Sequence, residues 1–209
     1  MEDYRTIHGT ATGEYEEKKS RFIAALSFAD SEEAAVAFLE QVRAANRTAR
    51  HNVYAYRLRE GNRERYSDDG EPAKTAGTPA LEVLQHSGLT DLIVVVTRYF
   101  GGVLLGTGGL VRAYSGAVKE GIAASKIGTM RYGVRLKICT DYNGIGRIQY
   151  ILRQNGLEAE DTVYTDQVEL TVLLAAECVP GLKKEITEAT AAKAGIEEVE
   201  KLYFVAPDA

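Results

Sequence analysis

The chain contains 209 residues, of which 45% are hydrophobic and 26% are charged, and its formal net charge at pH 7 is −5. This length is sufficient for one large domain or two small ones that bury a core without disulfide bonds. No apolar run approaches the roughly 18 residues that a membrane helix requires, and the acidic start of the chain, Met1–Tyr4, shows no secretory signal. We therefore expect a cytoplasmic protein without a membrane partner. The negative charge disfavours indiscriminate nucleic-acid binding by the whole molecule.

The first half of the chain predicts a mixture of strands and helices. Its expected elements are strands over residues 4–10 and 22–28, a helix over residues 31–45, a strand over residues 51–58 and a helix from Thr78 to Gly88. The first two strands form a hairpin whose polar turn includes Gly13. Asp30 and Glu33 give the first helix a capping-box-like start, while Thr78 as N-cap and Gly88 as C-cap bracket the second. We expect these helices to cover one face of a sheet.

A glycine-rich stretch then connects a buried strand to a helix. The strand is predicted over Leu92–Val96, the stretch covers residues 97–114, and the helix continues to about Ser125. In one interpretation, unpaired N–H groups and the positive end of the helix dipole form an anion site. In the other, the glycines only permit positive φ angles and close packing. The candidate ligand residues of the first interpretation are Arg98, Gly101, Gly102, Thr107, Gly108 and Arg112.

An acidic loop with turn chemistry carries the second set of candidate residues. Asp68, Asp69 and Glu71 place three carboxylates within four positions, and Lys74 and Thr75 follow as further candidate ligand residues. In one interpretation the carboxylates hold Mg²⁺, which prefers oxygen ligands, and the ion bridges to a phosphate at the glycine-rich turn. In the other, the two aspartates cap a turn while Glu71 and Lys74 form a surface ion pair. Mg²⁺ is the one cofactor that this pattern suggests.

Basic side chains are concentrated in two places of the first half. Arg98 stands at the end of the buried strand, where an arginine either binds a phosphate or carboxylate or neutralises Asp68 or Asp69 as a structural ion pair. Seven arginines also occur within the 23 residues from position 43 to position 65. Those considered as RNA contacts are Arg43, Arg47, Arg50 and Arg57. The alternative for this cluster is an ordinary solvated surface.

The sequence assigns no catalytic residue. It contains neither a G-x-S-x-G motif nor a thiol beside a base. The remaining groups are carboxylates, Arg98, Lys74 and backbone N–H groups, and this combination suits anion binding better than bond breaking. We therefore expect a binding protein rather than an enzyme.

The second half predicts a separate small domain after a hinge-like segment over residues 128–133. Its expected elements are a strand over residues 134–140, a helix over residues 144–155, a hairpin of residues 162–164 and 168–174, a helix from Pro180 to Lys193 and a strand over residues 198–205. The order β-α-β-β-α-β is that of a ferredoxin-like domain. The predicted domains are thus residues 1–128 and 129–209, and we interpret the second as a binding or dimerisation module.

Four segments of the first half resemble the signature segments of the YigZ/IMPACT family. They stand in the expected order and are Lys19–Phe22, Ala49–Tyr56, Ser67–Pro72 with Thr75–Gly77, and Arg98–Gly102 with Leu105–Gly106. The resemblance implies an α+β chain of two domains. The first would be an α/β sandwich similar to domain two of ribosomal protein S five, and the second would be a ferredoxin-like βαββαβ domain. Together the two look like domains four and five of elongation factor G.

The same resemblance bears on function. Eukaryotic IMPACT proteins restrain the starvation-activated kinase of general amino-acid control by competing for its activator. They do so through an additional N-terminal domain outside the matching segments, so that activity is not carried over. For bacterial members the resemblance implies a role near translation or nucleic acid and no settled reaction.

The sequence is therefore compatible with three functions. The first is a cytoplasmic binding or regulatory protein associated with translation, whose glycine-rich turn and Arg98 contact RNA, the ribosome or a translation-related protein. The second is a Mg²⁺-dependent enzyme that acts on a small phosphorylated or carboxylated metabolite, with the acidic loop holding the metal. The third is a protein–protein adaptor.

Overall fold

The computed structural model describes residues 2–205, which form two units. The first unit comprises Tyr4–Thr129, and the second comprises residues 130–205 together with residues 2–3. Among the described residues there are two five-stranded sheets and five α-helices. This mixed architecture confirms the expected α+β class with two domains.

The first unit contains one complete five-stranded sheet with the order β2-β3-β6-β4-β5. Its elements are β1 (Tyr4–His8), β2 (Thr10–Glu17), β3 (Ser20–Phe28), α1 (Glu32–Ala45), β4 (His51–Leu58), a 3₁₀ turn (Glu60–Asn62), β5 (Arg63–Ser67), α2 (Gly77–Ser87), β6 (Leu92–Tyr99) and α3 (Gly106–Ala123). Neighbouring strands of this sheet are antiparallel throughout.

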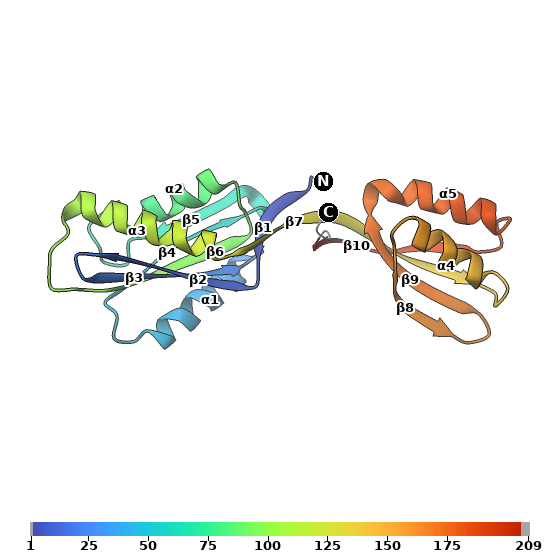
Figure 1. Cartoon of the computed structure of the whole chain (residues 1–209), viewed down its shortest axis with the longest axis horizontal. Helices are drawn as coiled ribbons and strands as arrows, with labels where there is room; N and C mark the ends of the chain where they lie inside the picture. The colour runs from blue at the N-terminus through green and yellow to red at the C-terminus, as the bar shows by residue number, and fades with distance from the viewer. Residues whose placement is uncertain (1, 206–209) are drawn as a thin grey trace. The chain divides into compact units, whose positions relative to one another are not determined.

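Both faces of this sheet are covered by helices (Figure 1). The central strand β6 explains why, because its side chains alternate between two cores. Leu92, Val94 and Val96 pack with α2 and α3, whereas Ile93 and Val95 pack with α1 on the opposite face. The expectation of helices on one face was therefore wrong, and the continuous apolar run of β6 is the signature of a strand buried on both sides.

The β2–β3 hairpin turns later than expected. Glu17 pairs with Ser20, so Lys18 and Lys19 form a two-residue turn. Gly13 lies inside β2 instead, and a Cβ atom there would stand 2.2 Å from the backbone nitrogen of Gly121. Gly13 therefore permits the backbone of α3 to approach β2, which is a tertiary requirement and not a turn signal.

The helix caps also differ from the local signals. The hydroxyl of Ser31, and not Asp30, caps α1 by accepting a hydrogen bond from the nitrogen of Ala34. Helix α2 begins at Gly77 with no cap from its neighbouring side chains, while its end at Gly88, in the left-handed conformation, is as expected. The hydroxyl of Thr78 is buried without a hydrogen-bond partner among the described residues.

The arginine-rich segment contains a strand that the sequence did not predict. β5 pairs with β4 at the edge of the sheet and exposes most of its side chains. A short, strongly charged strand is typical of a sheet edge, because charge discourages pairing with other chains. The same charge makes such a strand resemble a loop in the sequence.

The second unit has the order β-α-β-β-α-β. Its elements are β7 (Lys126–Thr140), α4 (Ile145–Gln154), β8 (Ala159–Tyr164), β9 (Val168–Ala175), a 3₁₀ turn (Ala176–Cys178), α5 (Val179–Ala189) and β10 (Gly195–Val205). β7 pairs with β9 and β10, and β8 pairs with β9. Figure 1 shows α4 and α5 on one face of these strands, where they bury a separate core. The expected hinge-like segment, residues 128–133, lies within the continuous strand β7, and the boundary between the two units, after Thr129, falls inside it.

No helix within residues 2–205 is long and apolar enough to cross a membrane.

The contact between Gly13 and α3 predicts a steric effect on stability. We expect Gly13→Ala to lower the free energy of unfolding by about 3 kcal/mol, since the new methyl group meets backbone atoms that cannot rotate away. Gly108→Ala, in the same unit, is the control. Its Cβ would meet only the tip of Arg112 at 3.9 Å, so alanine should stabilise α3 by about 0.5–1 kcal/mol. Urea unfolding followed by circular dichroism would check both changes, and an unaltered midpoint for Gly13→Ala would contradict the packing argument.

Candidate functional site

Four loops of the first unit converge at one end of its sheet. They are the β2–β3 turn, the α1–β4 loop (residues 46–50), the β5–α2 loop (residues 68–76) and the β6–α3 loop (residues 100–105). The antiparallel register produces this convergence, because Tyr99 at the end of β6 lies opposite Arg21 on β3, and Arg98 lies opposite His51 on β4. The four segments that resemble the family signature therefore meet in space, although they span more than 80 positions of sequence.

A buried ion pair lies at the centre of this end. Nη1 of Arg98 donates to Oε1 of Glu71 at 2.7 Å, and the Tyr114 hydroxyl donates to the same oxygen at 2.8 Å. The Arg98 guanidinium also lies 5.5 Å from the ring centre of Phe22 and 5.6 Å from that of Phe100. Burial, together with the charge of Glu71, raises the pKa of Tyr114, so its hydroxyl stays protonated and donates.

This ion pair corrects two of the sequence-based alternatives. Arg98 neutralises Glu71, not Asp68 or Asp69. Glu71 is only 8% exposed and forms no surface ion pair with Lys74. The sequence could not select the partner, because three carboxylates stand close together in the loop and only the fold decides which one is buried.

The two aspartates of the acidic loop are occupied by backbone groups. Oδ1 of Asp68 accepts from the nitrogens of Ala76 and Gly77 at 3.1 and 2.8 Å, so Asp68 caps α2 from a distance along the chain. Its Oδ2 accepts from the nitrogen of Lys74. Thr75 is buried, and its hydroxyl donates to the carbonyl of Pro72 at 2.6 Å. These contacts give the loop a fixed shape.

Asp69 connects the acidic loop to β4 and α1. Its Oδ2 accepts from the nitrogen of Asn52 at 2.6 Å, and its Oδ1 accepts from Arg43 at 3.2 Å. Within residues 2–205 there is no group of three His, Cys, Asp or Glu side chains that could hold a metal ion. The three carboxylates have separate partners, so the structure provides no shared ligand set for the Mg²⁺ considered above.

A pocket of about 440 Å³ opens beside the ion pair, and we call it the basic pocket. It is lined by Thr48, Arg50, His51, Arg98, Tyr99, Phe100 and Leu104. Arg50 is exposed and has no ion pair among the described residues. Nε of Arg98 is buried without a hydrogen-bond partner there. The pocket thus combines the unpaired cation of Arg50 with exposed apolar side chains, since Phe100 is 55% and Leu104 83% exposed.

His51 presents one free ring nitrogen to this site. Its Nδ1 lies 2.8 Å from the carbonyl oxygen of Asp69, which can only accept, so Nδ1 carries the proton. Nε2 has no partner within residues 2–205. This nitrogen accepts a hydrogen bond in the neutral ring and donates one in the charged ring.

The glycine-rich turn is held by packing at its first position. Gly101 donates its N–H to the Ser20 hydroxyl at 3.1 Å, and a Cβ atom there would lie 2.1 Å from the carbonyl carbon of Lys19. Gly102 and Gly106 have φ angles of 88° and 71°. Glycine is therefore required at these positions for conformational reasons, as the second interpretation of the turn proposed.

The remaining candidates of the glycine-rich stretch lie on α3. Thr107 and Gly108 are exposed in its first turn, and Arg112 is exposed one turn later. None of the three lines the basic pocket. Their role as ligand residues stays a prediction.

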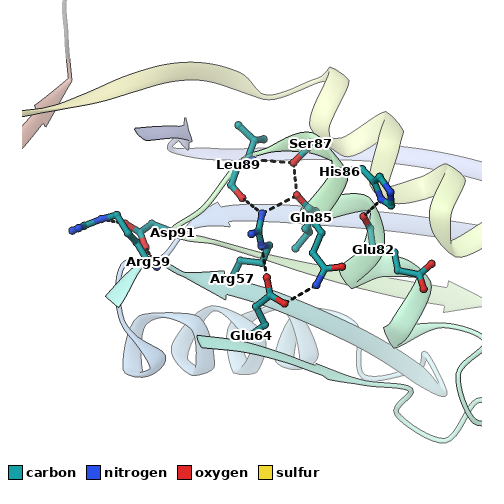
Figure 2. Close-up of polar contacts among 10 residues, drawn as sticks. Arg57, Arg59, Glu64, Glu82, Gln85, His86, Ser87, Leu89 and Asp91 are labelled. Carbon is teal, nitrogen blue, oxygen red and sulfur yellow. Dashed lines mark hydrogen bonds and ion pairs between the residues drawn. The ribbon is translucent and has the colours of Figure 1, made fainter. Parts of the chain in front are cut away.

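Only one of the four arginines considered as RNA contacts lines the pocket. Arg43 bonds to Glu40 and Asp69. Nε of Arg57 donates to Glu64 at 2.7 Å, and its Nη1 donates to the carbonyls of Leu84 and Leu89 at 3.3 and 2.8 Å. Figure 2 shows the Arg57 side chain between Glu64 and Leu89. Arg57 therefore ties β4 to β5 and to the end of α2. Arg47 and Arg50 are exposed and without an ion pair among the described residues, and Arg50 alone of the four faces the pocket.

Sequence reasoning did not select five of the seven lining residues as site residues, namely Thr48, His51, Tyr99, Phe100 and Leu104. His51, Tyr99 and Phe100 stood within the resembling segments, and that was the signal available for them. Their juxtaposition with Arg50 follows from the pairing of β4 with β6, which a single sequence does not reveal.

The buried pair predicts a strong stability effect. Arg98→Met leaves the Glu71 carboxylate buried without its cation, and we expect a loss of about 3–5 kcal/mol in the free energy of unfolding. The double variant Arg98→Met/Glu71→Gln removes the stranded charge and keeps an oxygen for Tyr114, so it should lose much less. Chemical denaturation of both proteins checks this, and equal losses would show that the charge pair is not responsible. Arg98→Glu would add a second buried carboxylate, so it does not separate binding from folding.

Comparisons with family models and with curated relatives indicate the same family. Residues 18–122 match the Impact N-terminal domain, and residues 139–193 match a domain of unknown function, DUF1949. The chain is 34% identical over 205 residues to the IMPACT family member YvyE of Bacillus subtilis (strain 168), covering 98% of this chain and 94% of the relative. It is 46% identical over 125 residues to the family member YigZ of Escherichia coli (strain K12), covering 58% of this chain and 61% of the relative. A crystal structure described as that of a hypothetical protein superimposes with a TM-score of 0.64 at 34% identity, over 96% of this chain and 98% of the other. The chain belongs to the IMPACT family.

Proposed function

We propose that this chain is a cytoplasmic binding and regulatory protein of the translation apparatus, and that its basic pocket holds a phosphate-bearing segment of RNA. The observation that carries the proposal is the convergence of Arg50, His51 and Arg98 with Tyr99 and Phe100 in one pocket. A cationic side chain beside an exposed aromatic ring, here Arg50 and Phe100, is a combination with which proteins bind single-stranded nucleic acid.

The local charge supports an anionic ligand despite the net charge of −5. Glu71 compensates Arg98, which leaves the charge of Arg50 for a ligand. Arginine matches phosphate oxygens with a planar fork of donors, and such charge-assisted hydrogen bonds are stronger than neutral ones. Screening confines the repulsion of distant carboxylates to about 8–10 Å at ordinary ionic strength.

The glycine-rich turn supports the same ligand because it carries a side chain of the pocket and precedes a helix N-terminus. It holds Phe100, whose exposed ring offers a stacking surface for a base, and it leads into the positive end of the α3 dipole. A base stacked on an aromatic ring contributes about 1–3 kcal/mol without regard to its identity. The pocket volume lies within the range of about 300–1,000 Å³ that is usual for small-ligand sites, so it suits one nucleotide.

The pocket gives a direct binding prediction with a matched control. Arg50→Glu should weaken the binding of a labelled single-stranded RNA at least tenfold, since it replaces a phosphate contact with repulsion. Arg47→Glu changes the charge equally at an exposed position three residues away that does not line the pocket, and its affinity should stay within twofold of the parent. Fluorescence anisotropy at several salt concentrations measures both, and the affinity of the parent should fall steeply with salt.

Two outcomes of this measurement would contradict the proposal. Salt-independent or undetectable RNA binding by the parent chain would remove its basis. An equal loss in Arg47→Glu and Arg50→Glu would show that the binding is diffuse and does not use the pocket.

The connection to translation has its own test. When the parent chain is used as bait in a lysate at low salt, ribosomal RNA or ribosomal particles should be retained, and nuclease should release them. Arg47→Glu should retain them as the parent does, and Arg50→Glu should not. Retention of a protein partner that persists after nuclease in all three baits would instead favour the adaptor function.

A further inference from the structure

Lys18 and Lys19 form the β2–β3 turn and lie outside the basic pocket. Both lysines are exposed, and neither forms an ion pair within residues 2–205, although Glu16 and Glu17 precede them on β2. Two positive charges are therefore available to a ligand at this turn.

The backbone of this turn is unfavourable for lysine. The φ angles of Lys18 and Lys19 are 46° and 67°. Positive φ at both positions is the requirement of a type I′ turn, for which the usual dipeptide is Asn-Gly. Lysine has a Cβ atom and no side-chain oxygen to support this conformation. The turn thus carries two residues that fit its backbone poorly, so the geometry of the turn does not account for the presence of lysine at these positions.

The turn lies directly beside the loop that carries Phe100. Gly101 donates its N–H to the Ser20 hydroxyl at 3.1 Å, and a Cβ atom at Gly101 would stand 2.1 Å from the carbonyl carbon of Lys19. Two residues after the turn, Arg21 pairs with Tyr99, which lines the pocket. A strand that leaves the pocket past Phe100 therefore meets the Lys18–Lys19 turn.

We propose that the Lys18–Lys19 turn is a second phosphate-binding subsite, which contacts the RNA backbone next to the nucleotide held in the basic pocket. This inference rests on the proposed function and specifies its ligand as a single strand of several nucleotides, not a mononucleotide. Lysine is suited to this role because its ammonium is a mobile point charge that binds phosphate without reading the base.

The decisive variant is Lys18→Asn/Lys19→Gly. It removes both charges and introduces the dipeptide that a type I′ turn favours, so the melting temperature should be equal to or higher than that of the parent. The affinity for a labelled single-stranded octaribonucleotide at low salt should fall at least tenfold. The slope of log K against log salt should become less steep by about 1.4, because each neutralised phosphate of a single strand contributes about 0.7. The affinity for adenosine monophosphate should not change.

The control is Lys126→Asn/Lys193→Asn, which removes two exposed positive charges elsewhere on the chain. Its affinity should match that of the parent within twofold, and its salt slope should match within experimental error.

If octaribonucleotide binding requires Arg50 but is unchanged in Lys18→Asn/Lys19→Gly, the subsite is overturned and the proposed function stands. If that variant loses affinity for adenosine monophosphate by the same factor, the turn only shapes the pocket and the subsite is again overturned. If the parent binds no RNA but the lysines bind vesicles of anionic lipid, both proposals are overturned.

Discussion

The buried ion pair between Arg98 and Glu71 is the interaction on which this end of the first unit depends. Arg98 belongs to the central strand β6 and Glu71 to the loop before α2, while Tyr114 of α3 bonds to the same carboxylate oxygen. Removing two charges from water is costly, so such a pair adds little net stability compared with apolar residues of similar size. Its separation is strongly unfavourable, however, because either partner alone would be a buried and uncompensated charge. The pair therefore fixes where the acidic loop and α3 lie relative to the sheet.

The proposed function depends on the groups that line the pocket beside this ion pair. Glu71 accepts a hydrogen bond from Nη1 of Arg98, while Nε of Arg98 is buried without a partner among the described residues. Arg50 adds an unpaired charge from the α1–β4 loop, and His51 adds a free ring nitrogen from the start of β4. Phe100 adds an exposed ring from the glycine-rich turn. A negatively charged protein can present a locally basic site in this way, because screening makes the field at the pocket depend on near neighbours. Arg47 shows the contrast, since it is equally exposed but lies outside the pocket.

The acidic loop shows how a suggestive motif can be structural. Three carboxylates within four residues resemble a metal site, yet Asp68 caps α2, Asp69 bonds to β4 and α1, and Glu71 pairs with Arg98. Each carboxylate satisfies groups that would otherwise be unpaired in a loop held against the sheet. Spacing in sequence indicates that carboxylates are near one another along the chain, but the direction of each side chain follows from the φ and ψ angles of the turn, which here include positive φ at Asp69 and Gly70.

The sequence by itself determined the α+β class, the order of elements in the second unit and the limits of most helices, because hydrophobic periodicity, Gly88 as a cap and the apolar run of β6 are local signals. It also indicated the segments that form the candidate site. It did not determine the cap of α2, the role of Gly13, the strand β5 or the partner of Arg98. Each of these depends on a contact that the fold creates: with Asp68, Gly121, β4 and Glu71, respectively. The tertiary structure alone decided that Arg50, His51 and Phe100 share a pocket, because only the register between β4 and β6 and the approach of Gly101 to Lys19 bring them to one end of the sheet.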